Sequence, residues 1–247
     1  QVTATHNHPL RVMNNDGYIV WREAGELREG DVLVSAGFGA TQAAGGSGLS
    51  EDEAVFLGYL LAEDVLESRH STRFTNGDPE VGTEFTALAQ WLLDAEVKTY
   101  QGNNRVEYVI PGKAVRTELA ERYGLDYVGA AAKRVPHIVR TAGDKTQRAF
   151  LSALYEGDGW IDDSSSVGLG TASEQLARDV QQLLYGLGIP AALYRKYHQT
   201  YERHHWSVIV NPSAAHRFLN EIGFRSAHRS AQFEKNLRFS VPGPSVE

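Results

Sequence analysis

The chain has 247 residues, 42% of them hydrophobic, so it is long enough for one large domain or two smaller ones. It has no cysteine, which excludes disulfides, thiolate metal sites and a cysteine nucleophile. No apolar run approaches about 18 residues and no signal-peptide pattern opens the chain, so we expect a soluble, cytoplasmic protein without a membrane partner. The formal net charge of −7 argues mildly against a nucleic-acid partner, unless basic residues gather on one surface.

The N-terminal stretch, residues 1–35, predicts a small all-β segment. Alternating apolar residues on both sides of the turn Asn14-Asn-Asp-Gly17 are typical of a β-hairpin. Residues 36–50 are rich in Gly, Ala and Ser and predict a linker. Ser50, followed three residues later by Glu53, then predicts the capped start of a helix. A domain boundary is therefore expected near residue 50.

From residue 51 onward one pattern is used twice, which predicts an α+β fold built of two pseudo-symmetric αββαββα halves. The first half is expected to contain helices over 51–64, 84–96 and 113–123 and strands near 70–75, 79–83, 97–101 and 105–110. The second is expected to contain helices over 145–158, 172–186 and 213–222 and strands near 160–170, 190–198 and 204–210. The halves then span 51–125 and 145–226, with a connection at 126–144 and an irregular tail over 227–247.

The first helix of each half ends in the same short pattern of two small residues and an acid. Aligned at one offset, Gly58, Ala62 and Glu63 correspond to Ala153, Gly157 and Asp158. Small residues four apart lie on one helical face and let two helix backbones approach closely. We therefore predict two helices packed side by side, with two carboxylates close together at their ends. For either acid alone, a solvated group at a helix end is the alternative.

These blocks together resemble the LAGLIDADG homing endonucleases. Leu151-Ser-Ala-Leu-Tyr-Glu-Gly-Asp-Gly159 matches the nine-residue signature, and Leu57-Gly-Tyr-Leu-Leu-Ala-Glu-Asp64 is similar to the version common in inteins. Lys133-Arg-Val-Pro136 resembles the family's lysine block, and residues 176–190 resemble the block that follows the second motif. The resemblance implies saddle-shaped antiparallel sheets and a monomer that makes double-strand breaks at long asymmetric DNA targets.

The N-terminal segment resembles part of an intein Hint splicing domain. Thr5-His-Asn-His8 resembles the Thr-x-x-His block, and residues 21–31 resemble the segment that follows it. This implies a splicing role for Thr5 and His8, and homing of an intein as the purpose of the endonuclease. The printed chain starts with Gln1 and ends with Glu247, so we expect that splicing needs residues supplied from elsewhere. Autoprocessing of a longer protein stays an alternative function.

The two motif acids, Glu63 and Asp158, are the candidate catalytic residues and metal ligands, because paired carboxylates can hold divalent cations at a scissile phosphate. Oxygen ligands that leave room for water favour Mg²⁺, for which Mn²⁺ could substitute. By resemblance, Lys133 would organise the attacking water or stabilise phosphate charge. Asp64 stands where the second motif has Gly159. Asp64 is thus an alternative ligand, and a DNA- or RNA-binding relative with lost cleavage is the second hypothesis.

The DNA-binding surface is expected on the strands, because a two-stranded ribbon fits the major groove. The most basic stretch is 194–206, although an ordinary solvated hairpin would look the same. The candidate DNA-binding residues are Arg69, Arg73, Lys98, Arg105, Arg195, Lys196, Arg203 and His205, with His70, Asn76, Asn103 and Asn104 beside them. Residues 45–48 lack the Lys-Ser/Thr of a P-loop, so no nucleotide cofactor is expected.

Overall fold

The computed structural model describes residues 3–14, 18–34, 47–63, 71–163, 166–199 and 202–240. The chain divides into two compact units, Gln1–Phe38 and Gly39–Glu247. Among the helices of these ranges, none is both long enough and apolar enough to cross a membrane.

The N-terminal unit contains a three-stranded antiparallel sheet in the order β2-β1-β3. Its elements are β1 (Pro9–Met13), β2 (Ile19–Glu23), the short 3-10 helix η1 (Ala24–Glu26) and β3 (Val32–Leu33). Val12 pairs with Val20 across the first two strands and is fully buried. The predicted hairpin is confirmed, although residues 15–17 of its turn lie outside the described residues.

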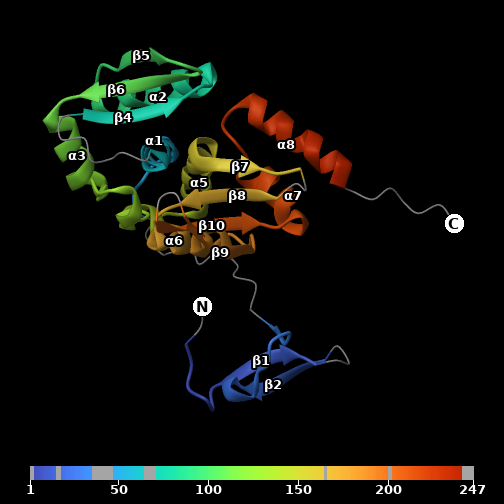
Figure 1. Ribbon diagram of the computed structural model, residues 1–247. Coiled ribbons are helices and arrows are strands. Elements are labelled where there is room, and N and C mark those ends of the chain that lie inside the picture. Colours follow the sequence, from blue (N-terminus) through green and yellow to red (C-terminus); the bar gives the residue numbers. More distant parts are fainter. Residues whose placement is uncertain are drawn as a thin grey trace. The chain divides into compact units, whose positions relative to one another are not determined.

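The first half of the second unit is a three-stranded antiparallel sheet covered by helices (Figure 1). Its elements are α1 (Glu51–Ala62), β4 (Ser71–Asn76), α2 (Pro79–Leu93), β5 (Lys98–Gly102), β6 (Arg105–Pro111) and α3 (Lys113–Tyr123). The capping box predicted at the start of α1 is present: Glu53 N donates to Ser50 Oγ at 3.2 Å, and Ser50 N donates to the Glu53 carboxylate at 2.8 Å. The rings of Phe74 and Phe85, 4.6 Å apart, join the sheet to α2.

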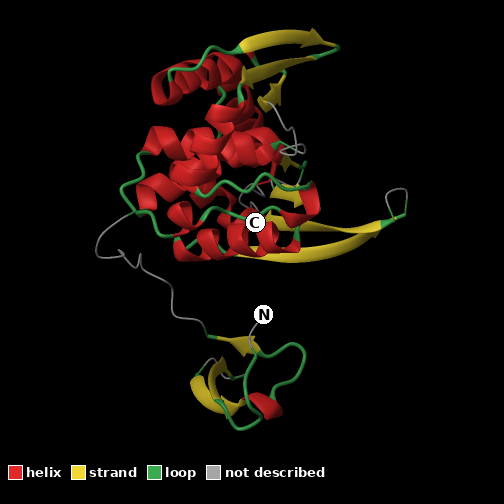
Figure 2. Cartoon of the chain, turned by 90° about the vertical axis from the view of Figure 1, so that its left-hand side faces the viewer, coloured by secondary structure: helices red, strands yellow, loops and turns green. Residues whose placement is uncertain are grey.

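The second half is built on a four-stranded antiparallel sheet in the order β7-β8-β10-β9. The connection carries η2 (Ala130–Ala132) and α4 (His137–Arg140). Then come α5 (Asp144–Asp158), β7 (Gly159–Ile161), β8 (Val167–Thr171), α6 (Glu174–Gly186), β9 (Ala191–His198), β10 (Arg203–Val210), α7 (Pro212–Glu221) and α8 (Ala227–Ser240). Within the second unit, helices gather on one side and the strands of both sheets on the other (Figure 2). The predicted α+β fold with antiparallel sheets is confirmed.

One predicted strand is wrong. Residues 79–83 form the first turns of α2, because Pro79 occupies the first helical turn and Asp78 caps it by accepting from Glu80 N at 2.9 Å. Val81 and Phe85, four residues apart, are buried on one helical face. The alternation in this stretch was too short to distinguish a strand from a capped helix.

The tail is also not irregular throughout, because residues 227–240 form α8. Phe233 on this helix is fully buried, and its ring lies 6.0 Å from that of Phe224. Only a few apolar residues mark the helix in the sequence, so its periodicity is weak. Tertiary packing, rather than a clear amphipathic pattern, explains why α8 forms.

Candidate active site

The two motif helices, α1 and α5, pack along each other through the small residues. A Cβ atom on Gly58 would lie 2.5 Å from the carbonyl oxygen of Phe150 and 2.8 Å from the Cβ of Ala153. A Cβ atom on Gly157 would lie 2.4 Å from that of Ala62. Each small residue therefore faces its counterpart in the other motif, and the side-by-side packing predicted from their spacing is confirmed.

This packing brings both motif acids to one groove. Glu63 is the residue that follows α1, where the backbone becomes extended, and Asp158 is the last residue of α5. Both line a groove of about 1010 Å³. The backbone N of Thr75 donates to Glu63 Oε1, and its hydroxyl donates to Glu63 Oε2 over 3.4 Å. Strand β4 thus holds the Glu63 carboxylate at the groove.

The donor set at this groove fits a hard divalent cation. Nowhere in the described ranges do three or more His, Asp or Glu residues form a group that could hold a metal. Mg²⁺, however, usually keeps several waters and takes only one or two protein carboxylates together with phosphate oxygens. Two carboxylates in an open groove meet that requirement. Asp64, the alternative ligand, lies outside the described residues.

Lys133 lies at the end of α1, and only 2% of its surface is exposed. Its ammonium group donates to the carbonyl oxygen of Leu61 at 3.0 Å and to that of Glu63. The Lys133 carbonyl in turn accepts from Ser173 Oγ at 2.6 Å. The last carbonyls of a helix have no partner within the helix and carry its negative dipole charge. Lys133 therefore caps α1 directly beside Glu63.

The basic residues predicted on the first-half sheet share one face. Arg73 of β4 and Lys98 of β5 both pair with Val109, and Arg105 lies four residues before it on β6. Successive side chains alternate between the faces of a strand, so this face is opposite the one that buries Phe74. Arg73 and Arg105 line the groove with the two acids, and Arg73 donates to Glu107 at 2.9 Å.

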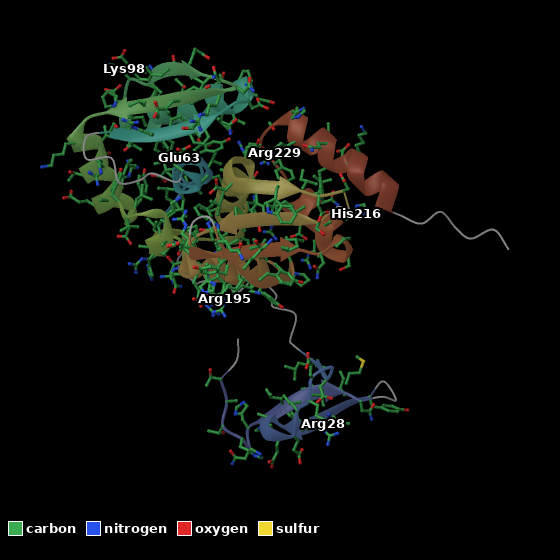
Figure 3. The ribbon with its side chains drawn as sticks, in the orientation of Figure 1. Arg28, Glu63, Lys98, Arg195, His216 and Arg229 are labelled. Atoms are coloured by element: carbon green, nitrogen blue, oxygen red, sulfur yellow. The ribbon has the colours of Figure 1, made fainter. Side chains whose placement is uncertain are left out.

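On the second-half sheet the predicted basic residues divide between the two faces. Lys196 pairs with His205, and Arg203 is two residues before His205, so these three share the face opposite the buried Val208. Arg195 lies on the other face, where its guanidinium stacks over Trp206 with 5.8 Å to the ring centre. In Figure 3, Lys98 and Arg195 lie on the two sheets, with Glu63 between them.

The remaining candidates have different positions. Arg69 and His70 lie outside the described residues. Asn76 lines the groove, whereas Asn103 and Asn104 form the β5–β6 turn, where Asn104 has a φ of 61°. In the N-terminal unit, Thr5 and His8 are joined in one exposed turn by a 3.0 Å bond from His8 N to Thr5 O.

Several groove residues were not singled out from the sequence. Thr75, Tyr100 and Glu107 line the groove with the acids. Thr75 is two residues from Arg73 and Tyr100 is two residues from Lys98, so strand alternation places them on the same face. Glu107 is likewise two residues from Arg105 on β6, but an acid is not expected beside basic residues on a DNA-facing strand.

Sequence comparison finds a family match in the second half. A family model described as a LAGLIDADG-like domain matches residues 145–223. Over its whole length the chain is 29% identical to the replication factor C small subunit of Methanocaldococcus jannaschii, of which it covers 13%. Over 91% of its length it is 28% identical to a DNA gyrase subunit of Mycobacterium leprae, of which it covers 18%. The chain thus spans less than a fifth of either relative.

Structural comparison finds the same fold in solved proteins. A mesophilic variant of the homing endonuclease I-DmoI matches with a TM-score of 0.52 and 16% identity, over 70% of this chain and 97% of that one. I-DmoI in complex with DNA and Mn matches with a TM-score of 0.51 and 15% identity, over 69% and 97%. At these identities the likeness shows the fold alone. Residues 145–223 thus match the model of a LAGLIDADG-like domain, and the fold of the chain is similar to that of the homing endonuclease I-DmoI.

Proposed function

We propose that this chain is a site-specific, metal-dependent DNA endonuclease that makes a double-strand break at a long asymmetric target. The observation that carries the proposal is the groove in which Glu63 and Asp158 meet the basic face of the first-half sheet. An anionic backbone can be held there by Arg73 and Arg105 while its phosphates approach two carboxylates. The two halves present different side chains, so the target is asymmetric.

The chain's own residues have separate tasks in this reaction. Basic side chains on the two sheet faces, Arg73, Lys98, Arg105, Lys196, Arg203 and His205, bind phosphates or read base edges. Glu63 and Asp158 would hold the divalent ion, Mg²⁺ or Mn²⁺. When bound, such an ion neutralises phosphate charge and acidifies a coordinated water. Thr75 orients the Glu63 carboxylate and Lys133 fixes the end of α1 beneath it.

We further propose that the cut serves the homing of an intein, with a monomer as the active form. Proteins with two different names share a stretch similar to this chain, and the stretch is a small part of each. That distribution is expected of an inserted element. On this proposal, residues 1–35 belong to the splicing domain, and the turn with Thr5 and His8 would assist an acyl shift in the longer protein.

The test uses a plasmid that carries the gene in which this coding sequence is inserted, with the inserted sequence removed. Wild-type protein should linearise it with Mg²⁺, whereas Glu63→Gln and Asp158→Asn should each cut at least roughly 1,000-fold more slowly, because removing a ligand carboxylate removes charge stabilisation at the phosphate. Glu118→Gln on α3, an exposed acid that pairs with Arg122, is the matched control. Full activity of both ligand variants would refute the assignment.

The same experiment separates the second candidate function. A protein that binds DNA without cutting would retain the target in a gel-shift assay and leave both strands intact with Mg²⁺ or Mn²⁺. The substitution of Asp64 for a glycine in the first motif is the feature that favours it. Cleavage by the wild type excludes it.

A further inference from the structure

Helix α5, like α1, has a basic side chain at the end that bears its acid. Arg229 of α8 donates through Nη1 to the carbonyl oxygens of Tyr155 and Glu156, each at 2.6 Å, and through Nη2 to that of Gly159. These carbonyls lie on both sides of Asp158 in the chain. Lys133 does the same at α1, where it binds the carbonyls of Leu61 and Glu63. Figure 3 shows Arg229 at the start of α8.

A positively charged group is needed at the C-terminus of α1 and of α5 for the same electrostatic reason. Two helix C-termini and two carboxylates meet at the seam, and all four carry negative charge or partial charge. Burial of the guanidinium lowers the pKa of Arg229, while the charges of Glu156 and Asp158 act in the opposite direction. An arginine remains cationic at neutral pH. Arg229 therefore places a positive charge within the field of Asp158.

Hydrogen bonds made by residues just before α8 also fix the position of Arg229. The buried carboxylate of Glu156 accepts from Arg225 N at 2.9 Å, from Ser226 N at 3.1 Å and from Ser226 Oγ at 3.0 Å. These bonds tie the start of α8 to the last turn of α5. The Arg229 guanidinium also lies 5.4 Å from the centre of the Phe224 ring. The guanidinium is thus held at the end of α5 before any ligand binds.

We propose that Arg229 is a positioning residue for Asp158, as Lys133 is for Glu63. The inference rests on the proposed nuclease function and extends it, because it gives each carboxylate its own supporting cation. The two supports come from different segments, the connection between the halves for α1 and α8 for α5. Loss of either should therefore disturb one carboxylate more than the other, and so one strand cut more than the other.

The test measures the two strand cuts separately. Full-length protein is mixed in excess with end-labelled target duplex and Mg²⁺, and each strand is followed under single-turnover conditions. Arg229→Met should slow one strand roughly 10- to 100-fold, the effect usual for losing a partner that orients a metal ligand, and Lys133→Met should slow the other. The Kd for DNA should change less than about 3-fold, since neither group lies on the sheet faces. Arg229→Lys should restore part of the lost rate.

Arg217→Met is the matched control. Arg217 of α7 also donates to a backbone carbonyl, that of Gly188, at 2.8 Å. Gly188, however, is remote in sequence from either motif acid. The Arg217→Met variant should cut both strands at the wild-type rate. The proposal is overturned if Arg229→Met cuts like the wild type, or if Arg229→Met and Arg229→Lys both slow the two strands equally.

A second measurement needs no cleavage. Amide hydrogen exchange should quicken in Arg229→Met at the end of α5 and not at the end of α1, with the reverse in Lys133→Met. If the wild type cuts no DNA, the proposed function fails, and this exchange pattern alone decides whether Arg229 positions the end of α5. Unchanged exchange at residues 157–159 would overturn the inference whatever the nuclease activity.

Discussion

The two motif helices are alike where they touch and differ where they are supported. Both present small residues to the seam, yet only α1 has a side-chain cap at its start, and α5 begins after Gly143 without one. Tyr59 of α1 donates to Glu84 at 2.5 Å, whereas the buried hydroxyl of Tyr155 on α5 has no partner among the described residues. Close approach of the two helices is therefore the constraint that both motifs share. The capping of the helix start and the hydrogen bonding of the tyrosine differ between the halves.

Of the substitutions at the helix seam, Gly58→Ala should change the free energy of unfolding most. The added methyl would meet the backbone carbonyl of Phe150, which cannot move without shifting α5, so we expect a loss of about 3 kcal/mol in the free energy of unfolding. Urea denaturation measures it. Gly186→Ala, where a Cβ meets nothing within 4 Å at the end of α6, should be neutral or slightly stabilising. Equal stability of the two variants would contradict the close approach.

Gly157→Ala should cost less, about 2 kcal/mol, because it meets a side chain rather than backbone. Its partner is Ala62, so the double variant Ala62→Gly/Gly157→Ala exchanges the two residues across the seam. A double-mutant cycle should show that the exchange recovers about 1 kcal/mol or more. Strict additivity would mean that the two positions do not face each other.

Removal of the hydroxyl should affect the free energy of unfolding differently at Tyr59 and at Tyr155. Tyr59→Phe removes a bond to Glu84 and should cost about 1 kcal/mol of unfolding free energy. Tyr155→Phe removes a buried hydroxyl that has no partner among the described residues and should be neutral or stabilising by up to about 1 kcal/mol. Thermal unfolding of both variants is the measurement, and a stabilised Tyr59→Phe would contradict the comparison.

An effect no larger than that of Tyr59→Phe is expected at the α1 cap, and it depends on pH. Burial raises the pKa of Glu53, but hydrogen bonds from Ser50 and Tyr123 and the charge of Arg122 outweigh it, so the pKa lies below its ordinary value. A depressed carboxyl pKa stabilises the fold above the unfolded-state pKa, and the contribution is lost as pH falls through the folded-state pKa. Glu53→Gln should therefore cost about 1 kcal/mol at pH 7 and almost nothing at about pH 2. Unfolding curves at the two pH values should differ accordingly.

The packing of the two motif helices and many residues of the sheet surface could be predicted from the sequence alone. The repeated small residues predicted which helix faces meet, and Arg73, Lys98 and Arg105, named as candidates from the sequence, share one face of the first-half sheet. The sequence could not show α8 or Arg229, because a helix with few apolar residues forms only when its partner surface exists. The face on which Arg195 lies could not be predicted for a related reason: one residue of register decides which face of a ribbon a side chain joins.

The position of Arg229 in the chain has a consequence for biosynthesis. Residues 225–229 follow every strand of both sheets in sequence, and a protein is synthesised from its N-terminus. A nascent chain can thus complete its DNA-facing strands while the end of α5 still lacks its cation. If Arg229 acts as proposed, the strands that bind DNA are complete on the ribosome before the residue that gives one of the two strand cuts its full rate.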